Sequence, residues 1–119
     1  MREFLLVFIG GGFGSALRFL FNRLIPQGSF PYSTLTVNMV GSFLIGMIIG
    51  YLISNNMLKS DYYYFLVVGI CGGLTTFSAF SIESIILLKQ GKILLMLSYI
   101  SLSSLLGITF CIIGMMFIK

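Results

Sequence analysis

The third of four apolar stretches in this chain contains a segment, Gly69 to Ser81, that is rich in glycines and hydroxyl residues and is poor material for a continuous membrane helix. In lipid every backbone N–H and C=O group needs a hydrogen-bond partner, so an interrupted helix is tolerated only where protein or a polar cavity covers the freed groups. Breaks of this kind are typical of binding sites in membrane proteins. The sequence therefore predicts a broken helix with a functional site beside it.

The composition is that of an integral membrane protein, since the 119 residues are 58% hydrophobic and only 8% charged. At roughly 20 residues per helical span, this length holds about four spans joined by short loops. We place these spans at residues 4–24, 32–53, 62–88 and 93–118, within one transmembrane domain over residues 1–119. A signal peptide is the alternative for the first stretch, but the charges of Arg2 and Glu3 cancel and favour a retained helix. The expected fold is an all-α membrane protein whose third helix is broken.

The basic residues divide equally between the two sides of the membrane. With four spans, one side collects Arg2, Lys59 and Lys119, whereas the other collects Arg23, Lys89 and Lys92. An excess of Lys and Arg normally sets the orientation, so a chain without one can insert both ways, although a tie among so few residues also arises by chance. A bundle too small to enclose a pore could then pair antiparallel with its inverted copy. The basic residues are scattered singly, so the net charge of +4 does not indicate a nucleic-acid partner.

Two polar residues of the first half are candidates for an ion path. Asn38 shares a helix face with Thr34 and Ser42, and its amide has two N–H donors that suit a dehydrated anion. Hydrogen bonding between helices is the commoner role of a buried asparagine. Arg18 is costly at membrane depth unless it faces a wet cavity or has a partner, and the alternative is that it snorkels to the interface. Either placement creates a positive field that favours anions over cations.

The break itself carries hydroxyls and two phenylalanines. Residues such as Thr76 and Ser78 can donate to an anion, or can satisfy the freed backbone groups. Phe77 and Phe80 project from nearly the same face, and their positive ring edges could hold a small hard anion, although packing is the ordinary role of such rings. Glu83 is the only acid well inside the apolar sequence, where an anion gate, a proton site and a rim residue near Lys89 are all open roles.

Three segments together resemble the Fluc (CrcB) family of fluoride channels: residues 14–19 (GSALRF), 34–43 (TLTVNMVGSF) and 72–80 (GGLTTFSAF). The resemblance covers all four spans, with only a loose match in the fourth. It implies a passive channel that exports fluoride across a bacterial plasma membrane and so protects the cell. It also implies an antiparallel dual-topology dimer with two fluoride pathways, formed with a second copy or with a homologous partner chain.

The resemblance also implies roles for individual residues. Phe77 and Phe80 correspond to an aromatic box, Asn38 to a pore amide, Arg18 to a vestibule cation, Glu83 to an acid near the pore end, and Thr76, Ser78, Tyr99 and Ser103 to a polar track. A structural sodium ion is expected on the backbone carbonyls of Gly72 and Thr75. The chain departs from the family pattern at Phe19, Ala79 and Gly107, which puts individual pore contacts in question.

Two other functions fit the size of the chain. A small multidrug-type transporter shares the length and dual topology, but it requires a membrane-embedded acid in the first span, and Phe4 to Leu17 contains none. A small assembly subunit would use its Gly10-xxx-Gly14 and Gly46-xxx-Gly50 pairs for partner contacts. An enzyme is not expected, because the sequence has no paired carboxylates, histidine cluster or phosphate-binding loop.

Overall fold

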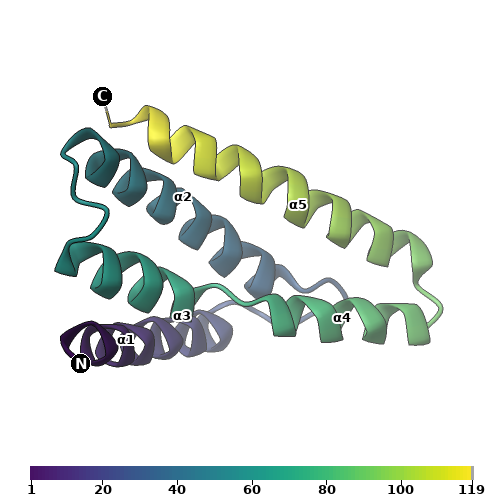
Figure 1. The fold of residues 1–119 in the computed structure, drawn as a ribbon. Helices are drawn as coiled ribbons and strands as arrows, with labels where there is room; N and C mark the ends of the chain where they lie inside the picture. Colours follow the sequence, from purple (N-terminus) through teal and green to yellow (C-terminus); the bar gives the residue numbers. More distant parts are fainter. Residues whose placement is uncertain (119) are drawn as a thin grey trace.

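The computed structural model describes residues 1–118. Its helices follow in the order α1 (Arg2–Leu24), α2 (Tyr32–Ser54), η1 (Tyr63–Cys71), α3 (Gly72–Leu74), α4 (Phe77–Lys89) and α5 (Ile93–Met116) (Figure 1). Four helical segments, with η1 to α4 counted as one, are long and apolar enough to cross a membrane. The all-helical fold with four candidate spans is confirmed, and the helix ends lie within two residues of the expected ranges.

The third span is broken at Thr75 and Thr76. Both residues are extended, with φ/ψ of −81°/156° and −148°/119°, between the short helix α3 and the helix α4. The side chain of Thr76 then caps α4, because its Oγ1 accepts the N–H of Ala79 at 3.1 Å. The predicted break is confirmed. Before the break, η1 is a π-helix rather than an α-helix, which the sequence did not indicate.

The first half of the third span packs against α1 through glycines. A Cβ atom at Gly14 would overlap the carbonyl oxygen of Ile70 and the amide nitrogen of Leu74, and one at Gly73 would overlap the carbonyl oxygen of Gly11. Gly10 and Gly69 meet in the same way. Small residues let the two backbones approach closely, as expected for a Gly-xxx-Gly pair in lipid.

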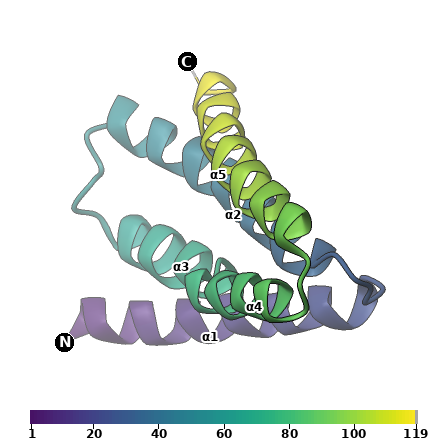
Figure 2. The same ribbon diagram turned by 90° about the vertical axis from the view of Figure 1, so that its right-hand side faces the viewer.

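A second close pair of helices is α2 with α5. A Cβ at Gly46 would overlap the carbonyl oxygen of Cys111, and one at Gly114 would overlap the carbonyl oxygen of Phe43. Figure 2 shows how α2 and α5 rise away from α1 and α3, so that the two helix pairs diverge like a wedge. The helix α4 contacts α5 and α2, and a small core around Leu35, Leu87 and Tyr99 fills the junction.

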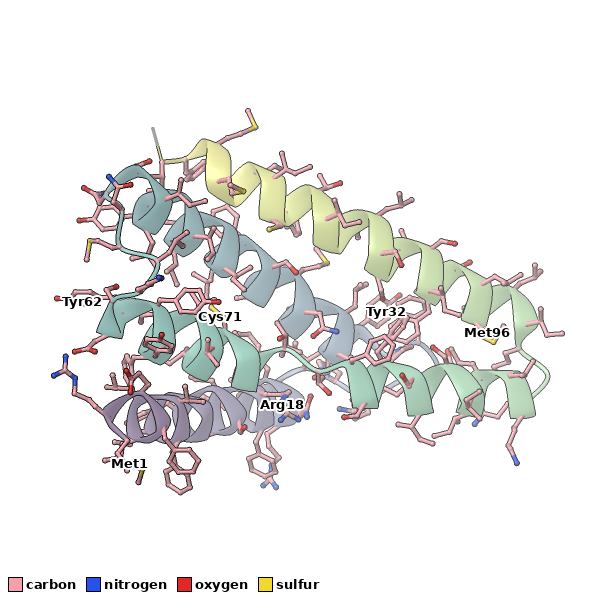
Figure 3. All side chains as sticks on the ribbon, viewed as in Figure 1. Met1, Arg18, Tyr32, Tyr62, Cys71 and Met96 are labelled. Carbon is pink, nitrogen blue, oxygen red and sulfur yellow. The ribbon has the colours of Figure 1, made fainter. Side chains whose placement is uncertain are left out.

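Many large apolar side chains are exposed on the outside of this bundle (Figure 3). Each of the four spans contributes to this exposed apolar surface, including residues such as Phe8, Tyr51, Ile82 and Leu105. A soluble monomer rarely exposes so much apolar area, whereas a surface that faces lipid or a partner subunit does. The buried interior is correspondingly small.

The glycine contacts generate a stability prediction. Gly14→Ala should destabilise the protein by roughly 1–3 kcal/mol, because the added methyl group meets backbone atoms that cannot move aside. Gly12→Ala is the matched control on the same helix, since its added Cβ would meet no other element of residues 1–118 within 4 Å. Thermal unfolding of the two purified variants in detergent measures the difference. Equal unfolding temperatures would show that the close contact of α1 with α3 does not support the fold.

Candidate functional site

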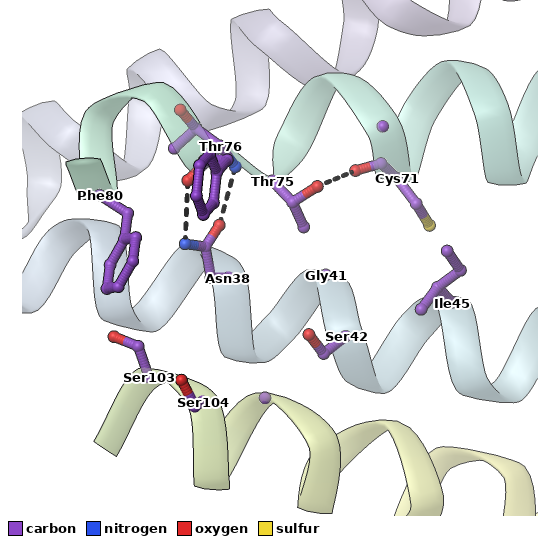
Figure 4. Close-up of a pocket in the computed structure, with 13 residues that line it drawn as sticks. Asn38, Gly41, Ser42, Ile45, Cys71, Thr75, Thr76, Phe80, Ser103 and Ser104 are labelled. Carbon is purple, nitrogen blue, oxygen red and sulfur yellow. Dashed lines mark hydrogen bonds between the residues drawn. The ribbon is translucent and has the colours of Figure 1, made fainter. Parts of the chain in front are cut away.

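A groove of about 390 Å³ lies between the two helix pairs, beside the break (Figure 4). Its lining comes from α2, η1, α3, α4 and α5 and consists of Asn38, Gly41, Ser42, Ile45, Cys71, Gly72, Thr75, Thr76, Phe77, Phe80, Ser103, Ser104 and Gly107. The lining holds no carboxylate and no basic side chain. The structure therefore brings most of the candidate residues named from the sequence to one place, and that place is neutral.

Asn38 pairs with the broken backbone. Its Nδ2 donates to the carbonyl oxygen of Thr76 at 3.2 Å, and the N–H of Thr76 donates to its Oδ1 at 2.8 Å (Figure 4). One side-chain amide thus satisfies both backbone groups of a residue that has left the helix, as a neighbouring strand would. One N–H of the amide remains for another acceptor. Asn38 positions the break as well as lining the groove.

The carbonyl oxygens that precede the break differ in their partners. The oxygen of Cys71 receives the N–H of Thr75 at 3.1 Å and its Oγ1 at 2.9 Å, and the oxygen of Gly73 receives Nε of Arg18 at 3.0 Å. The carbonyl oxygens of Gly72 and Thr75 receive no hydrogen bond from residues 1–118. These two oxygens are free to bind a cation or a partner.

Arg18 is half-buried and reaches the break from the side of α1 (Figure 3). Its guanidinium holds the carbonyl end of the segment formed by η1 and α3, where a cation also opposes the negative end of the helix dipole. It does not line the groove. Of the placements open from the sequence, this contact is the one in which the half-buried Arg18 has a hydrogen-bond partner.

Aromatic rings lead from the groove to Glu83. The centroid of Phe80 lies 5.7 Å from that of Phe77 and 5.1 Å from that of Tyr99. The hydroxyl of Tyr99 then donates to Oε1 of Glu83 at 2.9 Å. Phe77 is 78% exposed, whereas Tyr99 is completely buried. Of this series, Phe77 and Phe80 face the groove, and Tyr99 lies behind them.

Both carboxylate oxygens of Glu83 are bound by hydroxyl groups. Tyr99 of α5 occupies one, and Oγ1 of Thr34 on α2 donates to Oε2 at 2.9 Å. Hydrogen bonds to a charged acceptor are stronger than neutral ones. No ion pair within 4 Å joins Glu83 to a basic group in residues 1–118, Lys89 included. Glu83 instead joins three helices.

The two serines of the expected polar track have different environments. Ser78 is exposed, and its hydroxyl pairs with that of Thr76 at 3.3 Å. The Oγ of Ser103 is buried and has no partner in the described part of the chain, although the residue lines the groove. An unpartnered buried hydroxyl is costly, so it is suited to receive a ligand. Gly107 lies one turn further along the same wall.

Four apolar spans, a clamped helix break and a neutral groove of donors define a small membrane transport protein. The family model for "CrcB-like protein, Camphor Resistance (CrcB)" matches residues 5–115. The chain belongs to this CrcB family.

Curated relatives of the chain include proteins named "Fluoride-specific ion channel FluC" from three bacteria. The protein from Flavobacterium psychrophilum is 45% identical over 111 residues, which cover 91% of this chain and 90% of the relative. The protein from Aquifex aeolicus is 42% identical over 111 residues, with the same coverage. The protein from Leptospira interrogans serovar copenhageni is 41% identical over 124 residues, covering 99% of this chain and 95% of the relative. These relatives are ion channels and not enzymes, as the sequence predicts for this chain.

The pairing of Asn38 with Thr76 yields a prediction about the break. Asn38→Ala leaves a backbone N–H and a C=O without partners, at a cost of roughly 1–3 kcal/mol for each buried group. Amide hydrogen exchange at residues 75–79 should therefore accelerate, and the unfolding temperature should fall. Ser42→Ala is the control, because Ser42 lines the same groove one turn away and has no side-chain hydrogen bond in residues 1–118. Unchanged exchange in the Asn38 variant would contradict the clamp.

Proposed function

We propose that this chain forms a fluoride-selective channel that passively exports fluoride from the cytoplasm. The observation that carries the proposal is the neutral groove at the break, in a chain whose relatives are named fluoride-specific ion channels. Fluoride is small and strongly hydrated, so a selective pore must replace its water with donors and still release it. A groove without fixed charge meets both needs.

The donors at hand are of three kinds. Asn38 keeps one N–H beyond its contacts with Thr76, and Ser103 has a hydroxyl without a partner in residues 1–118. Phe77 and Phe80 offer ring edges, which carry the positive part of the aromatic quadrupole. Thr76, Ser78 and Tyr99 extend this polar track towards Glu83, and Arg18 contributes a positive field beside the break. The dehydrated anion would pass from donor to donor along the ring edges.

A second copy in the inverted orientation would complete the pathway. In the single chain the groove is open and Phe77 is 78% exposed, so an ion there would meet lipid. The balance of basic residues across the membrane supports dual insertion, and the apolar outer surface supports association. An antiparallel homodimer would then hold two symmetry-related pathways. A homologous partner chain would serve the same purpose.

Export needs no energy source in the chain. Hydrofluoric acid enters uncharged and dissociates in the neutral cytoplasm, where fluoride is trapped. An interior-negative membrane potential drives the anion outward, with about 2.3 kcal/mol per elementary charge for each 100 mV. A selective channel in a bacterial plasma membrane would thus protect the cell from fluoride.

We further propose a structural sodium ion at the break. The free carbonyl oxygens of Gly72 and Thr75 fit this ion, because hard cations bind oxygen ligands and these two oxygens lack other partners. Both residues line the groove face that a second copy would cover. When bound, the ion would be held by the carbonyl oxygens of Gly72 and Thr75 and would offset their partial negative charge.

Reconstitution of the purified chain in liposomes tests the proposed function. A fluoride gradient with a potassium ionophore should give rapid fluoride efflux, whereas an equal chloride gradient should give none. Proton-coupled movement of an organic cation, without fluoride efflux, would instead identify a transporter of the small multidrug type.

The two phenylalanines generate a prediction about conduction. Phe77→Ile or Phe80→Ile should lower fluoride efflux by more than about tenfold, since every 1.36 kcal/mol of lost stabilisation of the dehydrated ion costs a factor of ten. The size-exclusion profile should remain that of the wild-type assembly. Phe4→Ile, at an exposed position near the start of α1, is the control. Normal efflux in both groove variants would remove the aromatic rings from the mechanism.

Replacing sodium tests the proposed ion. In buffers where a large organic cation substitutes for sodium, the unfolding temperature of the assembly should fall and fluoride efflux should decrease, because the carbonyl oxygens of Gly72 and Thr75 lose their partner. Restoring sodium should reverse both changes, whereas restoring magnesium should not. An unfolding temperature that is independent of sodium would argue against the site.

A further inference from the structure

A second pocket, of about 240 Å³, is formed beside the turn from α4 to α5. This turn lies at the end of the molecule opposite the two termini (Figure 1). Its walls are the loop between α1 and α2, the last turns of α4 and the residue that precedes α5. Its polar lining consists of Gln27, Ser29, Glu83, Gln90 and Lys92. The pocket therefore holds one acid and one base, together with neutral amide and hydroxyl groups.

Glu83 connects this pocket to the groove at the break. The carboxylate lines the pocket, and it accepts the hydroxyl of Tyr99, whose ring packs on Phe80 of the groove. Phe80, Tyr99 and Glu83 thus form an unbroken series of contacts from the break to the pocket. An ion that follows the rings towards this end of the bundle arrives beside a fixed negative charge.

Lys92 is placed to offset that charge. Its backbone is held in the turn, because its N–H donates to the carbonyl oxygen of Leu87 at 2.9 Å and its own carbonyl accepts the N–H of Met96 at 3.0 Å. Lys92 is half-buried and lines the pocket, whereas Lys89, three residues earlier, is exposed and does not. No ion pair within 4 Å joins Lys92 to Glu83 in residues 1–118. The ammonium group of Lys92 is therefore available to attract an anion.

We propose that this pocket is a mouth of the ion pathway and that Lys92 is its anion-attracting residue. The inference rests on the proposed fluoride conduction and adds a residue to it. Without Lys92 the mouth would carry the uncompensated charge of Glu83 and would repel fluoride. With Lys92 the mouth is neutral overall, and the ammonium group raises the local concentration of the anion in the way that charged clefts steer ligands.

Fluoride efflux from liposomes at two ionic strengths tests this role, with Lys92→Gln compared to Lys89→Gln. At about 0.01 M ionic strength, where charges act over roughly 30 Å, Lys92→Gln should lower the initial efflux rate about three- to tenfold. At about 1 M of an impermeant salt, where the range is roughly 3 Å, the variant should approach the wild-type rate. The initial efflux rate of Lys89→Gln should stay within about twofold of the wild-type rate at both ionic strengths. Lys92→Arg should retain the wild-type rate, and Lys92→Glu should conduct less than Lys92→Gln.

Three outcomes would overturn the proposal: no effect of Lys92→Gln, an equal effect of Lys89→Gln, or a loss that persists at high salt together with a lower unfolding temperature. The first would place Lys92 outside the path, the second would indicate a general surface charge effect, and the third a purely structural role. Failure of the wild-type protein to conduct fluoride would refute the proposed function instead, so the two failures are distinguishable.

Discussion

The pairing of one asparagine side chain with one backbone residue is the constraint on which the rest of the structure depends. A helix cannot open in lipid unless the released N–H and C=O groups are bound elsewhere. Asn38 binds both groups of Thr76 from the neighbouring helix, and Thr76 itself caps the helix that follows. The groove exists because the chain can leave the helix at this point at low cost.

The other polar groups at the break fall into two sets, those with a hydrogen-bond partner in the described residues and those without one. Arg18 and the side chain of Thr75 bind the carbonyl oxygens of Gly73 and Cys71. The oxygens of Gly72 and Thr75 and the hydroxyl of Ser103 have no hydrogen-bond partner among residues 1–118. Two carbonyl acceptors and one hydroxyl donor in the same groove are thus available to a ligand. The groove offers the carbonyl acceptors that the proposed sodium ion would use and a neutral donor that the proposed fluoride path would use, without a charged side chain in its lining.

Much of this organisation could be predicted from local sequence. The spans follow from apolar length, the break follows from clustered glycines and hydroxyl residues, and the positions of Asn38, Phe77 and Phe80 beside it follow from spacing and from the family resemblance. Local sequence does not determine how helices rotate against one another. For that reason the pairing of Asn38 with Thr76 was not foreseen, and neither were the two hydroxyl partners of Glu83 or the anchoring of Arg18 on Gly73. The π-helical winding of η1 also lacked a signal, because residues 63–71 read as an ordinary apolar helix.

The break also separates two halves of the third span that pack mainly against different helices. Its first half, η1 and α3, is fixed to α1 by glycine contacts, whereas its second half, α4, contacts α5 and α2 and is tied to them through Glu83. No contact joins α4 to α1 among residues 1–118. The helix α2 contacts both halves, and within the third span the change of packing partner falls on the extended residues Thr75 and Thr76. The amide of Asn38, by binding both backbone groups of Thr76, therefore fixes the direction in which the second half of the span leaves the first.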